Sequence, residues 1–170
     1  MSVEFEKINA RELQENFIKS IAEHWALLCA GAPDHWNGMT VSWGGFGELW
    51  GFDAAFVFVR PQRHTFGLLE QGEAFTLSFG LPREALQLCG KSSGRDGDKM
   101  TKAGLHPAAA DGMVWPQEAE WVLLCRKAAA QDLDPATFCK PGLAAAHYPG
   151  EDYHRMYIGE IVMAKRRKIT

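Results

Sequence analysis

The chain has 170 residues, a formal net charge of −3 and a pI of about 6.1. This length can bury one hydrophobic core without disulfides or metal, so we expect a single domain over residues 1–170. A mildly acidic chain offers no overall positive field to nucleic acid or to an anionic membrane, and neither is expected as a partner.

The chain also shows no targeting or membrane-spanning signal. The first twenty residues carry charges throughout, and no stretch approaches the ~20 apolar residues that cross a bilayer. We therefore expect a cytoplasmic protein. Cys29, Cys89, Cys125 and Cys139 form no C-x-x-C pair, and no histidine stands at a ligand spacing such as H-E-x-x-H. These patterns predict reduced, mostly buried thiols and no metal site.

In chain order, the first predicted element is a short amphipathic helix within an N-terminal helical segment, residues 1–23. Apolar residues recur at helical spacing over residues 10–23, behind Asn9 as the candidate N-cap. Those apolar residues are Leu13, Phe17, Ile18 and Ile21.

Short β-prone apolar runs follow, and Gly or Pro bounds nearly all of them. They cover residues 25–29, 39–43, 54–59, 75–79, 121–125 and 156–163. Short helices are expected at residues 65–71, 82–88 and 96–103. Residues 127–153, rich in Ala, Pro and Gly, predict a long surface excursion that is either functional or mobile. The pattern favours a mainly β fold with short helices, a closed or nearly closed barrel.

The segment 37–47, NGMTVSWGGFG, is the most informative for function. Hydroxyls on alternate strand positions, followed by glycines, offer polar groups and room for a planar, polar ligand. A strand followed by a plain glycine-rich turn explains the same residues. The glycines do not match G-x-G-x-x-G, so the segment is not a dinucleotide-binding fingerprint.

Two further segments could bind an anion. Residues 60–65, RPQRHT, place two arginines at a strand end before a predicted helix, which suits a phosphate. A solvated basic turn is the alternative. Residues 89–99, CGKSSGRDGDK, permit nest-like turns in which Lys91 and Arg95 could close over a phosphate; the alternative is a flexible polar loop.

Catalytic side chains are sparse. There is no G-x-S-x-G elbow, no glycosidase-type carboxylate pair and no catalytic-cysteine signature. His154, in HRMYIGEI, could point toward a site, although a lone histidine is more often structural. The chemistry is therefore expected to come from a cofactor.

Taken in this order, the four segments resemble the flavin reductase-like family with its FMN-binding split barrel, especially the flavoredoxin-like branch. The similarity runs from about Trp25 to Ile161. It implies FMN as cofactor and a homodimer in which both subunits line each site. It also implies NADH or NADPH as a transient hydride donor, or a redox protein as partner.

The same resemblance implies which residues bind FMN. The strand at 37–43 would lie along the ring and ribityl chain, the segment at 60–65 would take the phosphate, and the loop at 89–99 would complete the pocket. His64 stands where many relatives carry Tyr, and His154 is the candidate catalytic residue near the reactive face. The implied FMN ligands are Asn37, Met39, Thr40, Val41, Ser42, Trp43, Arg60, Arg63, His64, Thr65, Cys89, Gly90, Lys91, Ser93, Arg95 and Lys99.

Three functions are compatible with these residues. The first is an FMN-dependent oxidoreductase of the flavin reductase type, which passes electrons from a nicotinamide or protein donor through FMN to a flavin or other acceptor. The second is a non-enzymatic FMN-binding electron carrier, favoured by the lack of a recognisable nicotinamide-binding motif. The third is a barrel that binds another anionic molecule, such as haem or a pyridoxal phosphate relative, because fold alone does not determine ligand.

Overall fold

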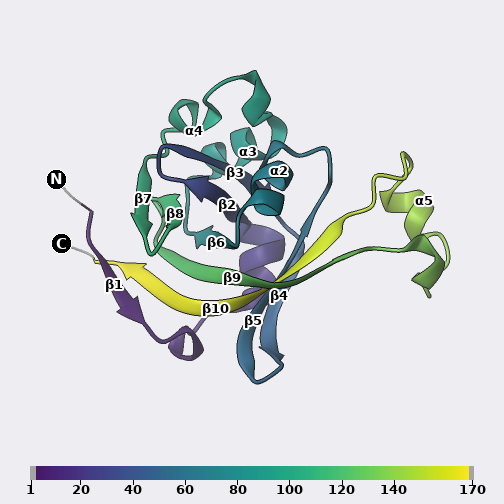
Figure 1. Cartoon of the computed structure of the whole chain (residues 1–170), viewed down its shortest axis with the longest axis horizontal. Helices are drawn as coiled ribbons and strands as arrows, with labels where there is room; N and C mark the ends of the chain where they lie inside the picture. The colour runs from purple at the N-terminus through teal and green to yellow at the C-terminus, as the bar shows by residue number, and fades with distance from the viewer. Residues whose placement is uncertain (1–2, 169–170) are drawn as a thin grey trace.

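Eight antiparallel strands form the main sheet of the computed structural model, which describes residues 3–168 (Figure 1). Their order is β3-β2-β6-β9-β10-β5-β4, and β1 pairs with β10. The strands are β1 (Phe5–Ile8), β2 (Ala26–Ala32), β3 (His35–Val41), β4 (Gly44–Leu49), β5 (Phe52–Val59), β6 (Ala74–Phe79), β9 (Trp121–Asp132) and β10 (Arg155–Arg167). A separate hairpin consists of β7 (Pro107–Ala110) and β8 (Met113–Pro116). The predicted mainly β class is confirmed.

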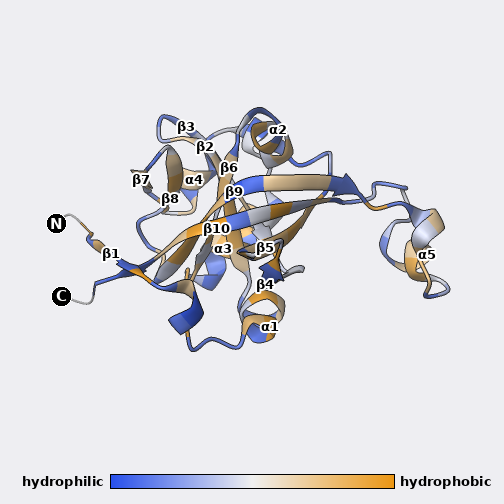
Figure 2. Cartoon of the chain, turned by 60° about the horizontal axis from the view of Figure 1, so that its bottom comes forward, coloured by the Kyte–Doolittle hydropathy of each residue, from blue (hydrophilic) through white to orange (hydrophobic). Residues whose placement is uncertain are grey.

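Strand β2 shows how the sequence pattern sets the core. Its apolar run lacks the alternation of a half-exposed strand, which indicates burial on both faces. Leu28 lies in the main barrel core with Leu77 of β6, whereas Leu27 and Cys29 pack into a second cluster with Leu86 of the helical layer. Figure 2 shows hydrophobic colours concentrated on the strands and hydrophilic colours on the connections.

Three short helices cover the β2–β3 side of the sheet: α2 (His64–Gln71), α3 (Arg83–Lys91) and α4 (Lys99–Lys102). The first two confirm the helices predicted at 65–71 and 82–88, with Pro82 at the N-cap position of α3. The helix predicted at 96–103 is shorter, because Gly97 at φ +118° separates α4 from a preceding 3₁₀ turn, η3 (Gly94–Asp96). None of the described helices is long and apolar enough to cross a membrane.

The continuous helix predicted over residues 10–23 is wrong. Asn9 caps only a single 3₁₀ turn, η1 (Ala10–Glu12), and Asn16 then caps a second start through Lys19 N at 3.1 Å. That start is α1 (Phe17–Lys19), which continues as a π-helical turn, η2 (Ser20–His24). A side-chain cap inside a periodic segment offers the backbone an alternative to helix, and here the alternative prevails.

The segment expected to end in a glycine-rich turn continues instead as β4. Only Ser42 and Trp43 separate β3 from β4. Strand β4 then turns into β5 through Trp50 and Gly51, at φ 56° and 83°, the positive values that a two-residue hairpin turn of type I′ requires. The glycines therefore belong to a hairpin strand.

The long excursion is also shorter than predicted, because residues 127–132 remain in β9 and pair with β10. We call residues 133–154, which connect β9 to β10, the arm. The arm contains a 3₁₀ turn, η4 (Pro135–Thr137), and a short helix, α5 (Leu143–His147), and it projects from one end of the barrel (Figure 1).

The cysteines are free, as expected from their spacing. Cys29, Cys89 and Cys125 are buried, and Cys139 in the arm is exposed. Burial raises the pKa of each buried thiol, most strongly at Cys29 and Cys125. These thiols therefore behave as small apolar groups of the core.

Gly159 provides a test of this packing. It lies beside an irregularity in the β9–β10 pairing, and a Cβ there would meet Phe75 Cζ at 2.6 Å and Cys125 Cβ at 2.9 Å. We expect Gly159→Ala to lower the free energy of unfolding by about 1–3 kcal/mol in urea denaturation. Gly47→Ala is the matched control, since nothing lies within 4 Å of its Cβ position. Equal effects of the two substitutions would contradict the packing argument.

Candidate functional site

A cavity of about 240 Å³ lies where β3, the end of β5 and the start of β10 meet. Strand β3 ends the sheet order, so one edge of its backbone has no strand partner among the residues that the structure describes. The cavity gathers residues from three of the segments singled out by the sequence. Its lining residues are Met39, Thr40, Val41, Ser42, Trp43, Phe58, Arg60, Arg63 and His154.

Arg60 leaves β5 at the cavity wall, but its guanidinium is held by the arm. It forms an ion pair with Asp152, donates from Nη2 to the His147 carbonyl at 2.9 Å, and lies 5.1 Å from the ring centroid of Tyr148. Gln62 Nε2 also donates to Asp152, at 2.6 Å. The hydrogen bond from Arg60 lowers the pKa of the Asp152 carboxyl. Arg60 thus joins the arm to the cavity and is not a free phosphate ligand.

Arg63 also has a structural task, at the C-terminus of α3. Its Nη1 donates to the Gly90 carbonyl at 2.8 Å and its Nη2 to the Cys89 carbonyl at 3.1 Å. Lys99 Nζ donates to the carbonyls of Cys89 at 3.2 Å and Ser92 at 3.1 Å. Cations are favourable at a helix C-terminus, where carbonyls lack partners. Burial lowers the pKa of both groups, and Lys99 is only 3% exposed.

A second cavity, of about 420 Å³, lies beside the start of β3 and takes in His35, Trp36 and Asn37 from that strand. Of the predicted ligands, it is lined by Asn37, His64 and Lys99. Burial lowers the pKa of His64, and the charges of Arg95 and Lys99 lower it further. These shifts mark an electropositive position.

The start of α2 connects the two cavities. Arg63, the residue before α2, lines the first, and His64, its first residue, lines the second. A helix of eight residues begins at this point, and helix N-termini favour anions. The residues of the RPQRHT segment are therefore divided between two neighbouring cavities.

Several predicted side chains face the protein. Thr65 is fully buried and accepts a hydrogen bond from Asn37 Nδ2 at 2.7 Å. The Thr40 hydroxyl donates to the Leu86 carbonyl, and the Cys89 thiol is fully buried. These contacts correct the expectation that the side chains of Thr65 and Cys89 bind a ligand, because their polar atoms are enclosed by the fold.

The remaining predicted residues line neither cavity. Lys91 is exposed at the end of α3, and Gly90 packs against the side chain of Thr40. The Ser93 hydroxyl accepts from Arg95 N at 3.2 Å, which caps η3, and Arg95 Nη1 donates to the Gln62 carbonyl at 3.0 Å. The loop at 89–99 contributes to the site mainly through Lys99, Gly94 and Gly97.

His154 lies on the cavity wall immediately before β10. It is 8% exposed, its ring centroid is 5.1 Å from that of Trp43, and its Nδ1 is 2.8 Å from Tyr148 Oη. Burial and the charge of Arg60 lower its pKa to about 4, although Asp152 acts in the opposite direction. The imidazole is consequently neutral at neutral pH.

Sequence reasoning missed the residues that the arm contributes. Tyr148, Asp152 and the His147 carbonyl all act on cavity-lining groups from a segment expected only as an excursion. The only signal was the density of aromatic and acidic residues in HYPGEDYH. Nothing in the local pattern could have paired them with a strand end about ninety residues earlier.

Comparison with known proteins decides the family. The profile described as "Flavin reductase like domain" matches residues 18–169. The chain belongs to this family. Comparison with curated protein sequences gives no match.

Solved structures show the same fold. An FMN-binding domain of a flavin reductases-like enzyme from Shewanella baltica has a TM-score of 0.65 and 14% identity, covering 98% of this chain and 78% of that one. The flavoredoxin of Desulfovibrio vulgaris has a TM-score of 0.65 and 17% identity, over 94% and 76%. A NADH:FAD oxidoreductase from Streptomyces globisporus, in complex with NAD and FAD fragments, has a TM-score of 0.61 and 16% identity, over 85% and 77%. The predicted split-barrel fold is confirmed.

The low pKa of His154 makes stability depend on pH. The unfolded chain protonates this imidazole below about pH 6.5, whereas the folded protein keeps it neutral down to about pH 4. The unfolded state therefore binds more protons in this window, and stability falls as pH is lowered through it. Between pH 6.5 and 4, the free energy of unfolding should fall less in His154→Gln than in the wild type, by up to about 3 kcal/mol. Urea unfolding at each pH measures this difference.

An imidazole NMR titration provides the direct check. Wild-type His154 is expected to titrate near pH 4. The pKa of the Asp152 carboxyl is lowered from its ordinary value of 3.8. Its titration therefore changes stability only below the range of pH 6.5 to 4 in which His154 is measured. A His154 titration midpoint close to 6.5 would contradict the burial argument.

Proposed function

We propose that this protein is an FMN-dependent oxidoreductase of the flavin reductase type. It would pass electrons from a nicotinamide or protein donor through FMN to a flavin or other acceptor. One observation carries the proposal: in a chain of this family, the free edge of β3, two arginines and a neutral histidine meet at one cavity. The similarity to an FMN-binding domain and to a NADH:FAD oxidoreductase supports it.

The groups present fit a flavin nucleotide. The free edge of β3 offers backbone donors and acceptors to the polar edge of a planar ring, and the indole of Trp43, 42% exposed, offers an aromatic surface. At the start of α2, Arg63 lines the first cavity and His64 lines the second, near the positive charges of Lys99 and Arg95. We place the ring at the first cavity and the phosphate at the start of α2, held by Arg63 and His64, with the positive charges of Arg95 and Lys99 nearby.

Bound FMN would supply the electron-transfer chemistry, and the chain's own residues would bind and tune it. The backbone of Met39 to Trp43 would fix the orientation of the ring. The charges of Arg60 and Arg63 would stabilise negative charge that develops on a ligand in the first cavity. His154 is neutral at neutral pH, so its imidazole would keep its one N–H proton and donate a hydrogen bond through it.

A non-enzymatic FMN-binding electron carrier is the second candidate. The similarity to a flavoredoxin supports it, as does the absence of a recognisable nicotinamide-binding motif in the sequence. It would use the same cavities and the same residues. The two functions differ only in whether a nicotinamide can reduce the bound flavin.

We propose in addition that the protein works as a cytoplasmic homodimer. Buried free thiols agree with a reducing compartment. Ile18 and Trp50 are 81% and 64% exposed, and the first cavity, at about 240 Å³, is small for a ligand pocket and would be completed by a second subunit. Sedimentation equilibrium tests this, since a monomer at micromolar concentration contradicts it.

Titration with FMN tests the ligand. We expect Arg60→Ala combined with Arg63→Ala to weaken FMN binding by at least ~2 kcal/mol, or about thirtyfold, because the variant loses the proposed phosphate contact of Arg63 and the positive charge that Arg60 places at the first cavity. Arg11→Ala is the control: Arg11 is exposed and pairs with Asp53, away from both cavities. Circular dichroism of each variant separates loss of binding from loss of the α3 cap. Unchanged affinity in the folded double variant would refute the assignment.

Anaerobic stopped-flow mixing with NADH or NADPH tests the reaction. Bleaching of the bound FMN by either nucleotide is expected for the oxidoreductase. Tight FMN binding without reduction by either would instead support the electron carrier. A purified protein that is colourless and does not bind added FMN would overturn both the oxidoreductase and the electron-carrier proposals.

A further inference from the structure

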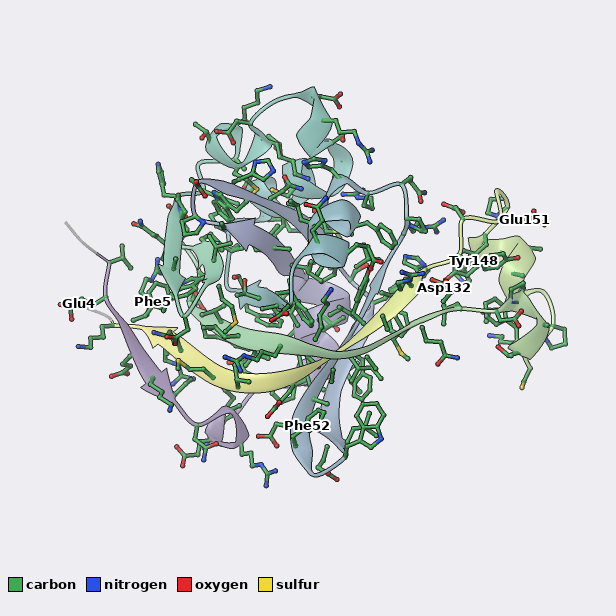
Figure 3. The ribbon with its side chains drawn as sticks, viewed as in Figure 1. Glu4, Phe5, Phe52, Asp132, Tyr148 and Glu151 are labelled. Atoms are coloured by element: carbon green, nitrogen blue, oxygen red, sulfur yellow. The ribbon has the colours of Figure 1, made fainter. Side chains whose placement is uncertain are left out.

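The arm contributes His154 to the lining of the first cavity and is fastened to the barrel. Asp152 pairs with Arg60 and accepts from Gln62, and the His147 ring meets the Trp43 ring edge to face at 5.4 Å between centroids. Figure 3 places Tyr148 at the base of the arm, near the end of β9 that Asp132 marks. Arm residues therefore determine how the cavity-lining side chains are held.

Tyr148 is the arm residue that touches His154 directly. It is 6% exposed, and its Oη lies 2.8 Å from His154 Nδ1. Its ring packs against Tyr153, at 4.8 Å between centroids, and under the guanidinium of Arg60, at 5.1 Å. Guanidinium has no acceptor for the phenolic hydrogen. Within residues 3–168, this hydroxyl forms no other hydrogen bond.

The direction of the hydrogen bond follows from satisfying both groups. Burial raises the pKa of Tyr148 and lowers that of His154, so the phenol is protonated and the imidazole is neutral. If Oη donates to Nδ1, the phenolic hydrogen finds an acceptor and the imidazole proton lies on Nε2. The reverse arrangement leaves a buried hydroxyl hydrogen without an acceptor, which is costly.

We propose that Tyr148 is a positioning residue that holds His154 as the Nε2–H tautomer, so that the cavity wall presents a neutral N–H donor. The groups that face the imidazole are Arg60 from the end of β5, Trp43 from the β3–β4 connection, and Tyr148 and Asp152 from the arm. The tautomer depends only on these contacts. That this N–H donates to an electron-rich edge of a bound ligand rests on the proposed function.

The tautomer is measurable without any ligand. Long-range ¹H–¹⁵N spectra of ¹⁵N-labelled protein at pH 7 distinguish protonated from unprotonated ring nitrogens, and His154→Gln identifies the signal among the six histidines. We expect unprotonated Nδ1 and protonated Nε2 in the wild type, and a mixture of tautomers in Tyr148→Phe. An Nδ1–H tautomer in the wild type, or an unchanged spectrum in the variant, overturns the proposal.

Tyr153→Phe is the matched control, because it removes a neighbouring hydroxyl of the arm for which no bond to His154 is recorded. Its His154 spectrum should equal that of the wild type, and thermal melts should show all variants folded. With FMN bound, Tyr148→Phe should slow flavin reduction by NADH or NADPH about fivefold, the scale of one hydrogen bond. If FMN does not bind, the proposed function fails while the spectra still decide the tautomer.

Discussion

The fold depends on one long antiparallel pair, β9 with β10. Both strands belong to the barrel, and the arm connects them at one end. Strand β10 also pairs with β5 and β1, so it must bend while it stays hydrogen-bonded on both sides. Gly159 makes the bend compatible with the core, because Phe75 and Cys125 occupy the space of a side chain. Irregular pairing at such a point increases twist and redirects a strand. This geometry carries His154 and the arm to the end of β5.

The positive charges near the site serve the fold as well as a ligand. Arg63 and Lys99 hold the last carbonyls of α3, and Arg60 holds the arm through Asp152. A phosphate receptor built from free arginines would have required none of these contacts. An anion at the start of α2 would instead meet charges that are already positioned, which reduces the entropic cost of ordering long side chains.

The low exposure of His154 follows from its contacts with Trp43 and with Tyr148 of the arm. The arm packs Tyr148, His147 and Asp152 against residues that leave β3 and β5. Because Tyr148 and His154 are buried, charges and hydrogen bonds act strongly on the imidazole. A neutral imidazole beside a cationic guanidinium is the result, and it is a useful group where negative charge is to be accommodated.

The sequence by itself determined the strands and much of the site. Burying the apolar runs predicted at 25–29 and 121–125 is favourable, so the burial and strand character of most of their residues could be predicted. The family resemblance carried by NGMTVSW, RPQRHT and HRMYIGEI implied that these segments meet, and Met39 to Trp43, Arg60, Arg63 and His154 do share a cavity. The sequence analysis expected only Asn9 to cap this helix, and the cap formed by Asn16 became apparent only in the structure.

Only the tertiary structure decided how the polar groups are used. Whether Arg63 faces a ligand or the α3 carbonyls depends on where α3 ends, and whether Thr65 is exposed depends on Asn37, 28 residues earlier. The same holds for Tyr148, whose partner Arg60 is fixed by the pairing of β10 with β5. Periodicity reports burial of apolar surface, whereas hydrogen-bond partners are set by distances between segments far apart in the chain.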